Sequence, residues 1–194
     1  ETVGIRVASV LLLLVFAIKA AVVPLHFWLP SSYAEAPAPV AALFAIMTKV
    51  GAYAIIRVYT LVFPPEVAVT SGLHDIWLLP AALLSLAIGM IGVLAAKRLD
   101  RLVAFAVIGS MAMVMVSISL FTPTGIAAAL YYIVHSTLAA AALFLISDLV
   151  RTGRGNVELT AQSPMIGAAL TAALFFAAAI AMAGLPPLSG FLGK

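Results

Sequence analysis

Long apolar runs, separated by short polar connections, are the main pattern along the chain. A helix needs about 20 mostly apolar residues to cross a bilayer. Six segments meet or approach that length and a seventh is partial: 7–23, 36–62, 77–96, 102–121, 125–147, 165–183 and 188–194. Their apolar residues surround each predicted helix instead of forming one stripe, which is typical of burial on every side. The pattern predicts an all-α membrane protein, with one polytopic bundle of transmembrane helices as a single domain over residues 1–194.

Two interruptions break this pattern. The residues after Lys19 read AAVVPLHFWLPSSYAEAPAP, and Pro24 is the first of four prolines that cannot support one continuous helix. Near the end of the sixth run the interruption is GLPP, which contains Gly184, Pro186 and Pro187. Broken helices are tolerated in a membrane only where protein or a water-filled cavity satisfies the freed backbone groups. In transporters such paired breaks mark the transport path, whereas a kink that only serves packing is the alternative.

Composition excludes several classes of protein. Hydrophobic residues make up 65% and charged residues 9% of the chain, with a mean hydropathy of +1.24, whereas a soluble domain is about half apolar and about a quarter charged. The chain has no cysteine, so it can form no disulfide and no thiolate metal site. Its ten basic residues lack the aromatic interleaving of a nucleic-acid surface. Because the sequence has no nicotinamide, flavin or phosphate-loop motif, we expect no catalytic residue, no cofactor and no metal in this chain.

Charges in the connections predict the topology, because Lys and Arg are retained on the cytoplasmic side of a membrane. The connection KRLDR at 97–101 and the later connection with Arg151 and Arg154 are therefore predicted to be cytoplasmic. The uncharged connection FTPTG and the acidic connection PPEVAVTSGLHD, from Pro64 to Asp75, are predicted to lie on the opposite side. This alternation is self-consistent along the chain.

Lysines within apolar runs are the first candidates for function. Lys19 lies well inside the first run, and Lys49 lies midway along the second. A lysine near the bilayer centre costs about 2.5–3.5 kcal/mol, so both are predicted to face the bundle interior instead of lipid. Tyr53 and Arg57 follow Lys49 at i+4 and i+8, which predicts a polar stripe on one face of that helix. A lysine that snorkels to the membrane interface is the alternative.

The fifth apolar run contains a titratable residue, His135. Histidine titrates near neutral pH and can pass a proton between its two nitrogens. The hydroxyls of Tyr131, Ser136 and Thr137 are predicted to hold the imidazole, and a purely structural histidine is the alternative. Lys194 follows the GLPP break by seven residues, again in an apolar context. As a set, these intramembrane groups predict a path for protons.

Several strings resemble a known family. They are FAIKAAVVPLHFWLPSSYAEAPAPVAALFAIMTKVGAYAIIRV, KRLDRLVAFAVIGSM, YYIVHSTLAAAALFLISDLV and GLPPLSGFLGK. Together they run along nearly the whole chain, and they resemble the proton-conducting antiporter-like membrane subunits. The wording is most similar to the D subunits of Mrp-type multisubunit Na⁺/H⁺ antiporters. The related subunits of complex I and of membrane-bound hydrogenases share the general pattern.

This resemblance implies a fold and a set of residues. Family members contain two inverted repeats, each with a broken helix, so the chain is expected to form part of an inverted-repeat antiporter-like fold. The lysines and the histidine of the family's proton path match Lys19, Lys49, His135 and Lys194. The family's glutamate partner for the lysine at Lys19 belongs to a preceding helix outside this sequence. We therefore expect a piece of a longer protein, which also fits a chain that opens without Met and closes within an apolar run.

The implied function is proton translocation by one subunit of a Na⁺/H⁺, or other monovalent cation/proton, antiporter. Such a multi-pass subunit would lie in the lipid bilayer of the cell inner (plasma) membrane, with other membrane subunits as its partners. One alternative is a proton-pumping subunit of NADH:quinone oxidoreductase or of a membrane-bound hydrogenase, with the redox enzyme in other subunits. A scaffold without transport is a further alternative, but a scaffold gains nothing from lysines that are costly to insert.

Overall fold

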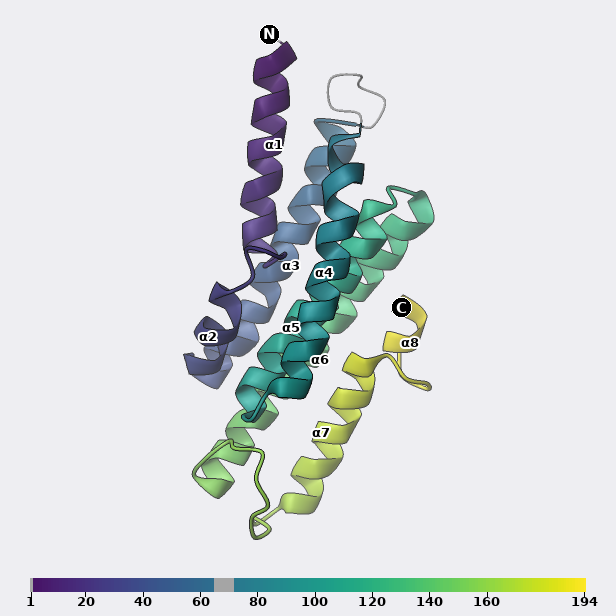
Figure 1. Ribbon diagram of the computed structural model, residues 1–194. Helices are drawn as coiled ribbons and strands as arrows, with labels where there is room; N and C mark the ends of the chain where they lie inside the picture. The colour runs from purple at the N-terminus through teal and green to yellow at the C-terminus, as the bar shows by residue number, and fades with distance from the viewer. Residues whose placement is uncertain (1, 65–71) are drawn as a thin grey trace.

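The computed structural model describes residues 2–64 and 72–194, and the described residues are nearly all helical (Figure 1). The helices are α1 (Thr2–Lys19), α2 (Trp28–Glu35), α3 (Ala38–Leu61), α4 (Leu73–Ala95), α5 (Leu99–Ser119), α6 (Pro123–Arg154), α7 (Ala168–Ala183) and α8 (Gly190–Gly193). Within these ranges extended pairing is limited to an isolated bridge between Arg98 and Glu158. The prediction of an all-α bundle is confirmed.

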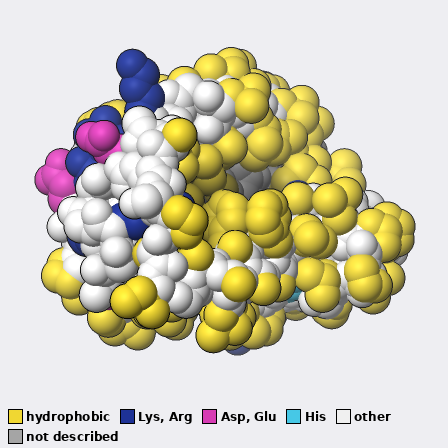
Figure 2. All heavy atoms as spheres, turned by 90° about the horizontal axis from the view of Figure 1, so that it is seen from below, with side chains coloured by type: hydrophobic (Ala, Val, Ile, Leu, Met, Phe, Trp, Pro, Cys, Tyr) yellow, Lys and Arg dark blue, Asp and Glu magenta, His cyan; other side chains and the backbone are white. Residues whose placement is uncertain are grey.

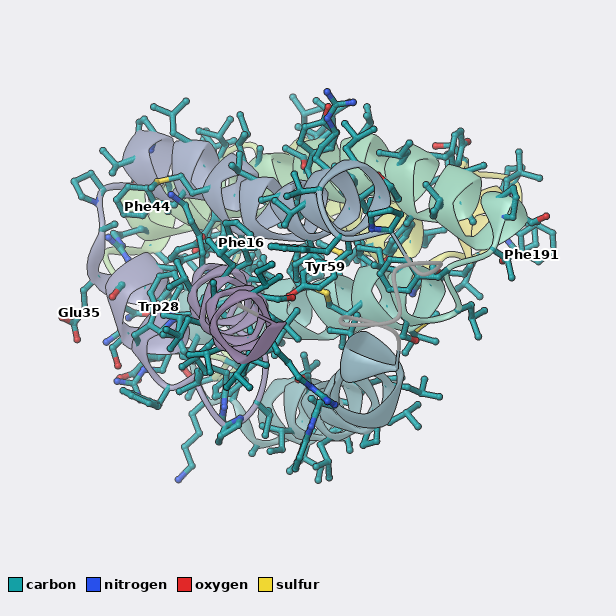
Figure 3. All side chains as sticks on the ribbon, turned by 90° about the horizontal axis from the view of Figure 1, so that it is seen from above. Phe16, Trp28, Glu35, Phe44, Tyr59 and Phe191 are labelled. Carbon is teal, nitrogen blue, oxygen red and sulfur yellow. The ribbon has the colours of Figure 1, made fainter. Side chains whose placement is uncertain are left out.

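Both predicted helix breaks are present. α1 ends at Lys19, and α2 begins at Trp28, beyond an irregular stretch that contains Pro24. α7 ends at Ala183, and the GLPP sequence separates it from the short α8. Figure 1 shows that α2 continues past the lower end of α1 and that α8 lies beyond the upper end of α7, so each pair forms one discontinuous helix. The breaks lie on opposite sides of the bundle, with Trp28 near one and Phe191 near the other (Figure 3).

Helix lengths suit a membrane. Among the described residues, four helical stretches are long and apolar enough to cross one: Ala38–Leu61, Trp77–Ala95, Leu99–Ser119 and Pro123–Arg154. At 16 residues α7 is shorter, because Gly184 stops it before the GLPP prolines. α6 is longer than the predicted 125–147. It begins at Pro123, where the Thr122 hydroxyl accepts a hydrogen bond from the Gly125 N–H, and it ends at Arg154, where Gly155 in a left-handed conformation caps the helix. Hydropathy marks the apolar part of a helix, whereas capping sets its ends.

The centre of the bundle is α5, which packs against α2, α3, α4 and α6. Two-thirds of its apolar stretch is buried, including Val103, Val107 and Ile118 with no exposed surface. The helices of the bundle leave many large apolar side chains exposed on the outer surface. In water this surface would be unfavourable, whereas lipid or neighbouring helices can cover it. The chain is therefore a membrane-spanning helix bundle.

The connections alternate between the two ends of the bundle. The α4–α5 and α6–α7 connections lie at one end and the α5–α6 connection at the other (Figure 1). Backbone hydrogen bonds join the first two, from the Leu99 N–H to the Val157 oxygen at 2.8 Å and from the Leu159 N–H to the Lys97 oxygen at 2.9 Å. Figure 2 shows this end, where charged side chains gather at one side of a largely apolar face. That this end is cytoplasmic stays a prediction, and most of the predicted acidic loop lies outside the described residues.

Candidate functional site

The end of α7 at the GLPP break is the first part of the candidate site. Gly184 adopts a left-handed conformation, φ +74°, that a residue with a side chain rarely adopts. Its N–H donates to the Ile180 oxygen at 3.0 Å and the Ala181 oxygen at 3.1 Å, and the Leu185 N–H donates to the Ile180 oxygen at 3.2 Å. The carbonyls of the last turn otherwise have no partner within the helix. One of them, the Ala181 oxygen, lies against Gly190 at the start of α8.

His135 on α6 binds across this break. One ring nitrogen, Nε2, lies 2.9 Å from the Ala181 oxygen, and the other, Nδ1, lies 2.9 Å from the Ser189 hydroxyl. A carbonyl can only accept, so Nε2 must carry a hydrogen. The Ser189 hydroxyl can donate to a neutral Nδ1 or accept from a protonated one. Both charge states of His135 therefore fit the same contacts, and only the hydroxyl hydrogen has to rotate.

Lys194 binds the same end of α7 from the far side of the break. Its ammonium donates to the Met182 oxygen at 3.0 Å and to the Ala183 oxygen at 2.9 Å. A cation is favourable at a helix C-terminus, where the backbone dipoles leave partial negative charge. The structure thus brings His135 and Lys194, which are far apart in sequence, onto the last three consecutive carbonyls of α7.

Different hollows of the bundle reach these two residues. His135 lines a mostly apolar groove of about 830 Å³ between α6 and α7, together with Tyr131 and Ser189. Lys194 lines another cavity, of about 380 Å³, between α4, α5, α6 and α7. The two side chains that bind the end of α7 therefore lie at different hollows. His135 lies at the groove between α6 and α7, and Lys194 lies at the other cavity.

Lys49 on α3 is buried, as predicted. Only 2% of its surface is exposed, and its ammonium has no hydrogen-bond partner among the described residues. The predicted polar stripe along α3 is wrong, because Tyr53 and Arg57 are exposed on the outside of the described chain. Each step of four residues turns a helix by about 40° beyond a full turn, so a stripe at i, i+4 and i+8 drifts away from the buried face.

Lys19 departs from the prediction. It is the last residue of α1, and its side chain is exposed on the described chain, not in the bundle interior. It nevertheless lies next to the first break, as predicted, and α3 approaches it closely through Gly51, which packs against the backbone of Lys19 and Ala20. α3 also packs against α6, which carries His135. Lys49 therefore sits on the helix that contacts both the break after Lys19 and the helix of His135.

Protein groups satisfy the backbone at the first break. The Val23 N–H donates to the Ser85 hydroxyl of α4 at 2.8 Å, and that hydroxyl donates to the Ala81 oxygen at 2.6 Å. The Trp28 indole donates to the Ile18 oxygen at 3.1 Å. Sequence reasoning did not identify Ser85, because a lone serine in an apolar helix is typical of a packing residue. Its partner becomes known only once α4 is placed beside the break.

The predicted neighbours of His135 are partly wrong. The Ser136 and Thr137 hydroxyls donate to the Ile133 oxygen of their own helix, at 3.3 and 2.7 Å, so they do not hold the imidazole. Tyr131 donates instead to the Ser189 oxygen at 3.3 Å. Sequence reasoning missed Ser189 because it lies 54 residues from His135. Serine and threonine hydroxyls in helices commonly donate to a carbonyl of the preceding turn, so these two hydrogen bonds could have been predicted from the residue types.

A buried carboxylate, Asp100, is a further residue that the sequence did not single out. Its oxygens accept from Arg98 at 2.6 and 3.1 Å, from Arg151 at 3.0 Å and from the Arg101 N–H at 2.7 Å. This cluster joins the start of α5 to the last turn of α6, at the end of the bundle. The hydrogen bond and charge of Asp100 raise the pKa of Arg98 above its ordinary value. The described residues contain no group of three or more His, Cys, Asp and Glu that could hold a metal ion.

Fold and site together define an antiporter-like membrane subunit. The chain belongs to the NADH:quinone oxidoreductase/Mrp antiporter transmembrane family, whose sequence profile matches residues 1–194. It is 41% identical over 197 residues to the D subunit of the Na⁺/H⁺ antiporter of Bacillus subtilis (strain 168), across 98% of this chain and 38% of the relative. The chain thus spans less than half the length of that relative.

Two solved structures show the same arrangement. A chain of the Mrp complex from Dietzia sp. DQ12-45-1b superposes with a TM-score of 0.86 and 32% identity, over 96% of this chain and 34% of its own length. A chain of respiratory complex I from Thermus thermophilus with bound NADH superposes with a TM-score of 0.84 and 32% identity, over 94% of this chain and 38% of its own length. The profile match and the two superpositions confirm the predicted family and fold, and both neighbours belong to multisubunit complexes.

Proposed function

We propose that the chain carries the proton path of one membrane subunit in a multisubunit Na⁺/H⁺, or other monovalent cation/proton, antiporter of the cell inner (plasma) membrane. The observation that supports this most is the shared binding of His135 and Lys194 to the last carbonyls of α7. These side chains can both gain and lose a proton, and they lie at different hollows. A proton that moves between them crosses from one hollow to the other.

The chemistry needs only local rearrangements. A proton that reaches Nδ1 of His135 makes the ring cationic, and the Ser189 hydroxyl turns from donor to acceptor. The Nε2–H then faces the end of α7, where the partial negative charge of the helix favours a cation. Lys194 is held at the neighbouring carbonyls by its ammonium hydrogens. Loss of a proton from Lys194 leaves an amine that can accept the next one.

Lys19 and Lys49 complete the proposed path on the other side of the bundle. Lys49 is buried and its ammonium has no partner among the described residues, which places a costly, unpaired polar group in the bundle interior. We assign the exposed ammonium of Lys19 to a face that another part of the complex covers. The resemblance to the family supports a glutamate on a preceding helix as its partner. Other membrane subunits are the proposed wider partners, as in the complexes of the structural neighbours.

A proton-pumping subunit of NADH:quinone oxidoreductase is the second candidate, and the similarity to a chain of respiratory complex I supports it. The higher identity to the D subunit of an antiporter, 41% against 32%, favours the antiporter. In either assembly, the proposed role of this chain is the same path for protons.

The test uses the full-length subunit in its assembled complex. His135→Gln keeps hydrogen bonding but cannot titrate, and Lys194→Ala removes the ammonium. We expect each change to reduce cation-dependent proton movement in inverted membrane vesicles to a small residual rate, followed with a pH-sensitive dye, while the complex still assembles. Lys97→Ala, which removes a lysine in the α4–α5 connection, is the control and should keep activity. Normal transport in both site variants would overturn the proposed path.

A further inference from the structure

A pocket of about 270 Å³ lies where α4 ends and α5 begins. One part of its lining consists of small residues at the end of α4, Gly92, Ala95 and Ala96, and another part is Phe105 on the second turn of α5. Gly92 lets the Phe105 ring lie directly against α4, because a methyl group at that position would collide with the ring. These residues leave an apolar recess at this end of the bundle.

The charged side chains in this lining are all cations, Lys97, Arg98 and Arg101. Arg98 is held in place by the buried Asp100, to which its Nε and Nη2 donate at 3.1 and 2.6 Å. Asp100 also binds Arg151, so one carboxylate is shared by two guanidiniums. The side chains of Lys97 and Arg101 are exposed, and neither makes an ion pair or a hydrogen bond with a described residue. The lining therefore contains two cations without a partner in the described part of the chain.

Carboxylates near this pocket do not line it. Glu35 and Glu158 lie close enough to attract Arg98, but neither belongs to the lining. Glu158 lines a separate pocket of about 250 Å³, together with Arg154. Arg154 is exposed near the same end of the bundle. It is therefore a cation in a comparable position, but its pocket also contains a carboxylate.

The basic pocket lies at the end of a membrane-spanning stretch. The apolar stretch of α4 runs from Trp77 to Ala95, and the basic residues follow within a few positions. Near the end of this stretch, Ile91 and Leu94 are 64% and 87% exposed on the described chain. Apolar surface therefore meets positive charge at this level, as hydrocarbon meets headgroups at the edge of a bilayer. A ligand that suits both would carry an anionic group joined to an apolar chain.

We propose that this pocket binds the headgroup of an anionic phospholipid, with its phosphate at Arg101 and Arg98 and an acyl chain along α4. A guanidinium can donate two parallel hydrogen bonds to a phosphate, and the Arg101 guanidinium has no other partner in the described chain. Asp100 fixes Arg98 and leaves its Nη1 without a described partner. Lys97 adds charge without a fixed geometry. Basic pockets between transmembrane helices bind headgroups of this kind.

Orientation in the membrane is a simpler explanation for these cations, because basic residues are retained in cytoplasmic connections. That explanation needs only charge in the connection. It does not account for cations gathered around one recess of small residues, nor for the shared carboxylate that fixes Arg98. A bound headgroup accounts for both.

Photocrosslinking of the assembled complex tests this site. The probe is phosphatidylglycerol with a photoreactive group in one acyl chain, and phosphatidylcholine with the same chain is the reference without net charge. Mass spectrometry of the peptides then locates the label. We expect phosphatidylglycerol to label the end of α4 at Ile91 and Leu94, and Arg101→Gln to lower this label by at least about fivefold through the loss of one charged contact. Arg154→Gln, which removes a cation outside the pocket, should leave the label unchanged.

Equal labelling of α4 in Arg101→Gln and in the unaltered complex, or equal labelling by the two lipids, would overturn the inference. Loss of the label in inorganic phosphate, but not in chloride of the same ionic strength, would show a site for a free anion and would also overturn it. Arg101→Lys keeps the charge and should restore most of the label, whereas a label as low as in Arg101→Gln would contradict the role of charge. This readout does not depend on transport, so it can fail while the proposed function stands.

Discussion

Replacing Asp100 by asparagine should destabilise the end of the bundle where the α4–α5 and α6–α7 connections meet. The side chain of Asp100 is 4% exposed, and its oxygens accept from Arg98, from Arg151 and from the backbone N–H of Arg101. The asparagine side chain would have the same shape but no charge, and its NH₂ group would face a guanidinium. The contact between the start of α5 and the last turn of α6 would then be lost.

The structure sets the size of this effect. Hydrogen bonds to charged groups contribute about 1.5–3 kcal/mol each. The side chains of Arg98 and Arg151 are 44% and 41% exposed, so water can solvate them again once the carboxylate is gone, and the contribution of each ion pair must be discounted. We therefore expect a loss of about 2–3 kcal/mol in the free energy of unfolding, below the cost of an ion pair that is buried on both sides.

Thermal melting of the purified complex measures this loss, and Asp148→Asn is the matched control. Asp148 lies on α6 near the same end, and its carboxylate makes no ion pair with a described residue. The hydrogen bond and charge of Asp100 raise the pKa of Arg98. The stability from this pair is therefore fully present at any pH below the ordinary pKa of a guanidinium, and it is lost only as the pH rises above the pKa of Arg98 in the folded protein. The destabilisation should therefore be the same at neutral pH and at about pH 9. Equal melting of the two variants would refute the reasoning.

Three further changes follow from the two breaks and from Lys49. Ser85→Ala leaves the Val23 N–H unpaired, so the complex should lose about 1–2 kcal/mol of stability by thermal melting, and an unchanged melting point would contradict this. Lys49→Met replaces a buried ammonium, unpartnered within the described chain, by an apolar side chain of similar length. It should raise the melting temperature and abolish transport, and a lower melting temperature would argue against an unpaired lysine. Gly190→Ala would press a methyl group on the Ala181 carbonyl and the His135 ring. Transport should fall, whereas Gly4→Ala, with open space around it, should not alter it.

Much of the fold follows from sequence alone, because its determinants are local. Apolar runs of membrane length predict helices, and the prolines after Lys19 and at GLPP predict where two of them break. The burial of Lys49 also follows, since a lysine in the middle of an apolar run is costly on a lipid-facing surface. Hydropathy did not predict where α6 begins and ends, because capping by Thr122 and Gly155 sets both ends.

The site was less predictable, because its contacts join distant segments. His135 meets Ser189 and Ala181 only once α7 and α8 pack beside α6. The exposure of Lys19 depends on which parts of a larger assembly cover α1, and no local pattern encodes that. Tyr132 was overlooked because the neighbouring Tyr131, at i−4 from His135, matched the helical spacing. At i−3, Tyr132 provides the stacking contact instead.

The central claim is that His135 and Lys194 act as one unit at the end of α7. A double-mutant cycle tests this directly, with His135→Gln, Lys194→Ala and the double variant in the full-length protein of the assembled complex. The measurement is the rate of residual cation-dependent proton movement in inverted vesicles at equal amounts of assembled complex. We expect the double variant to be no slower than the slower single variant, because either change already interrupts the shared path. Independent effects, with the rate losses multiplying in the double variant, would contradict the account.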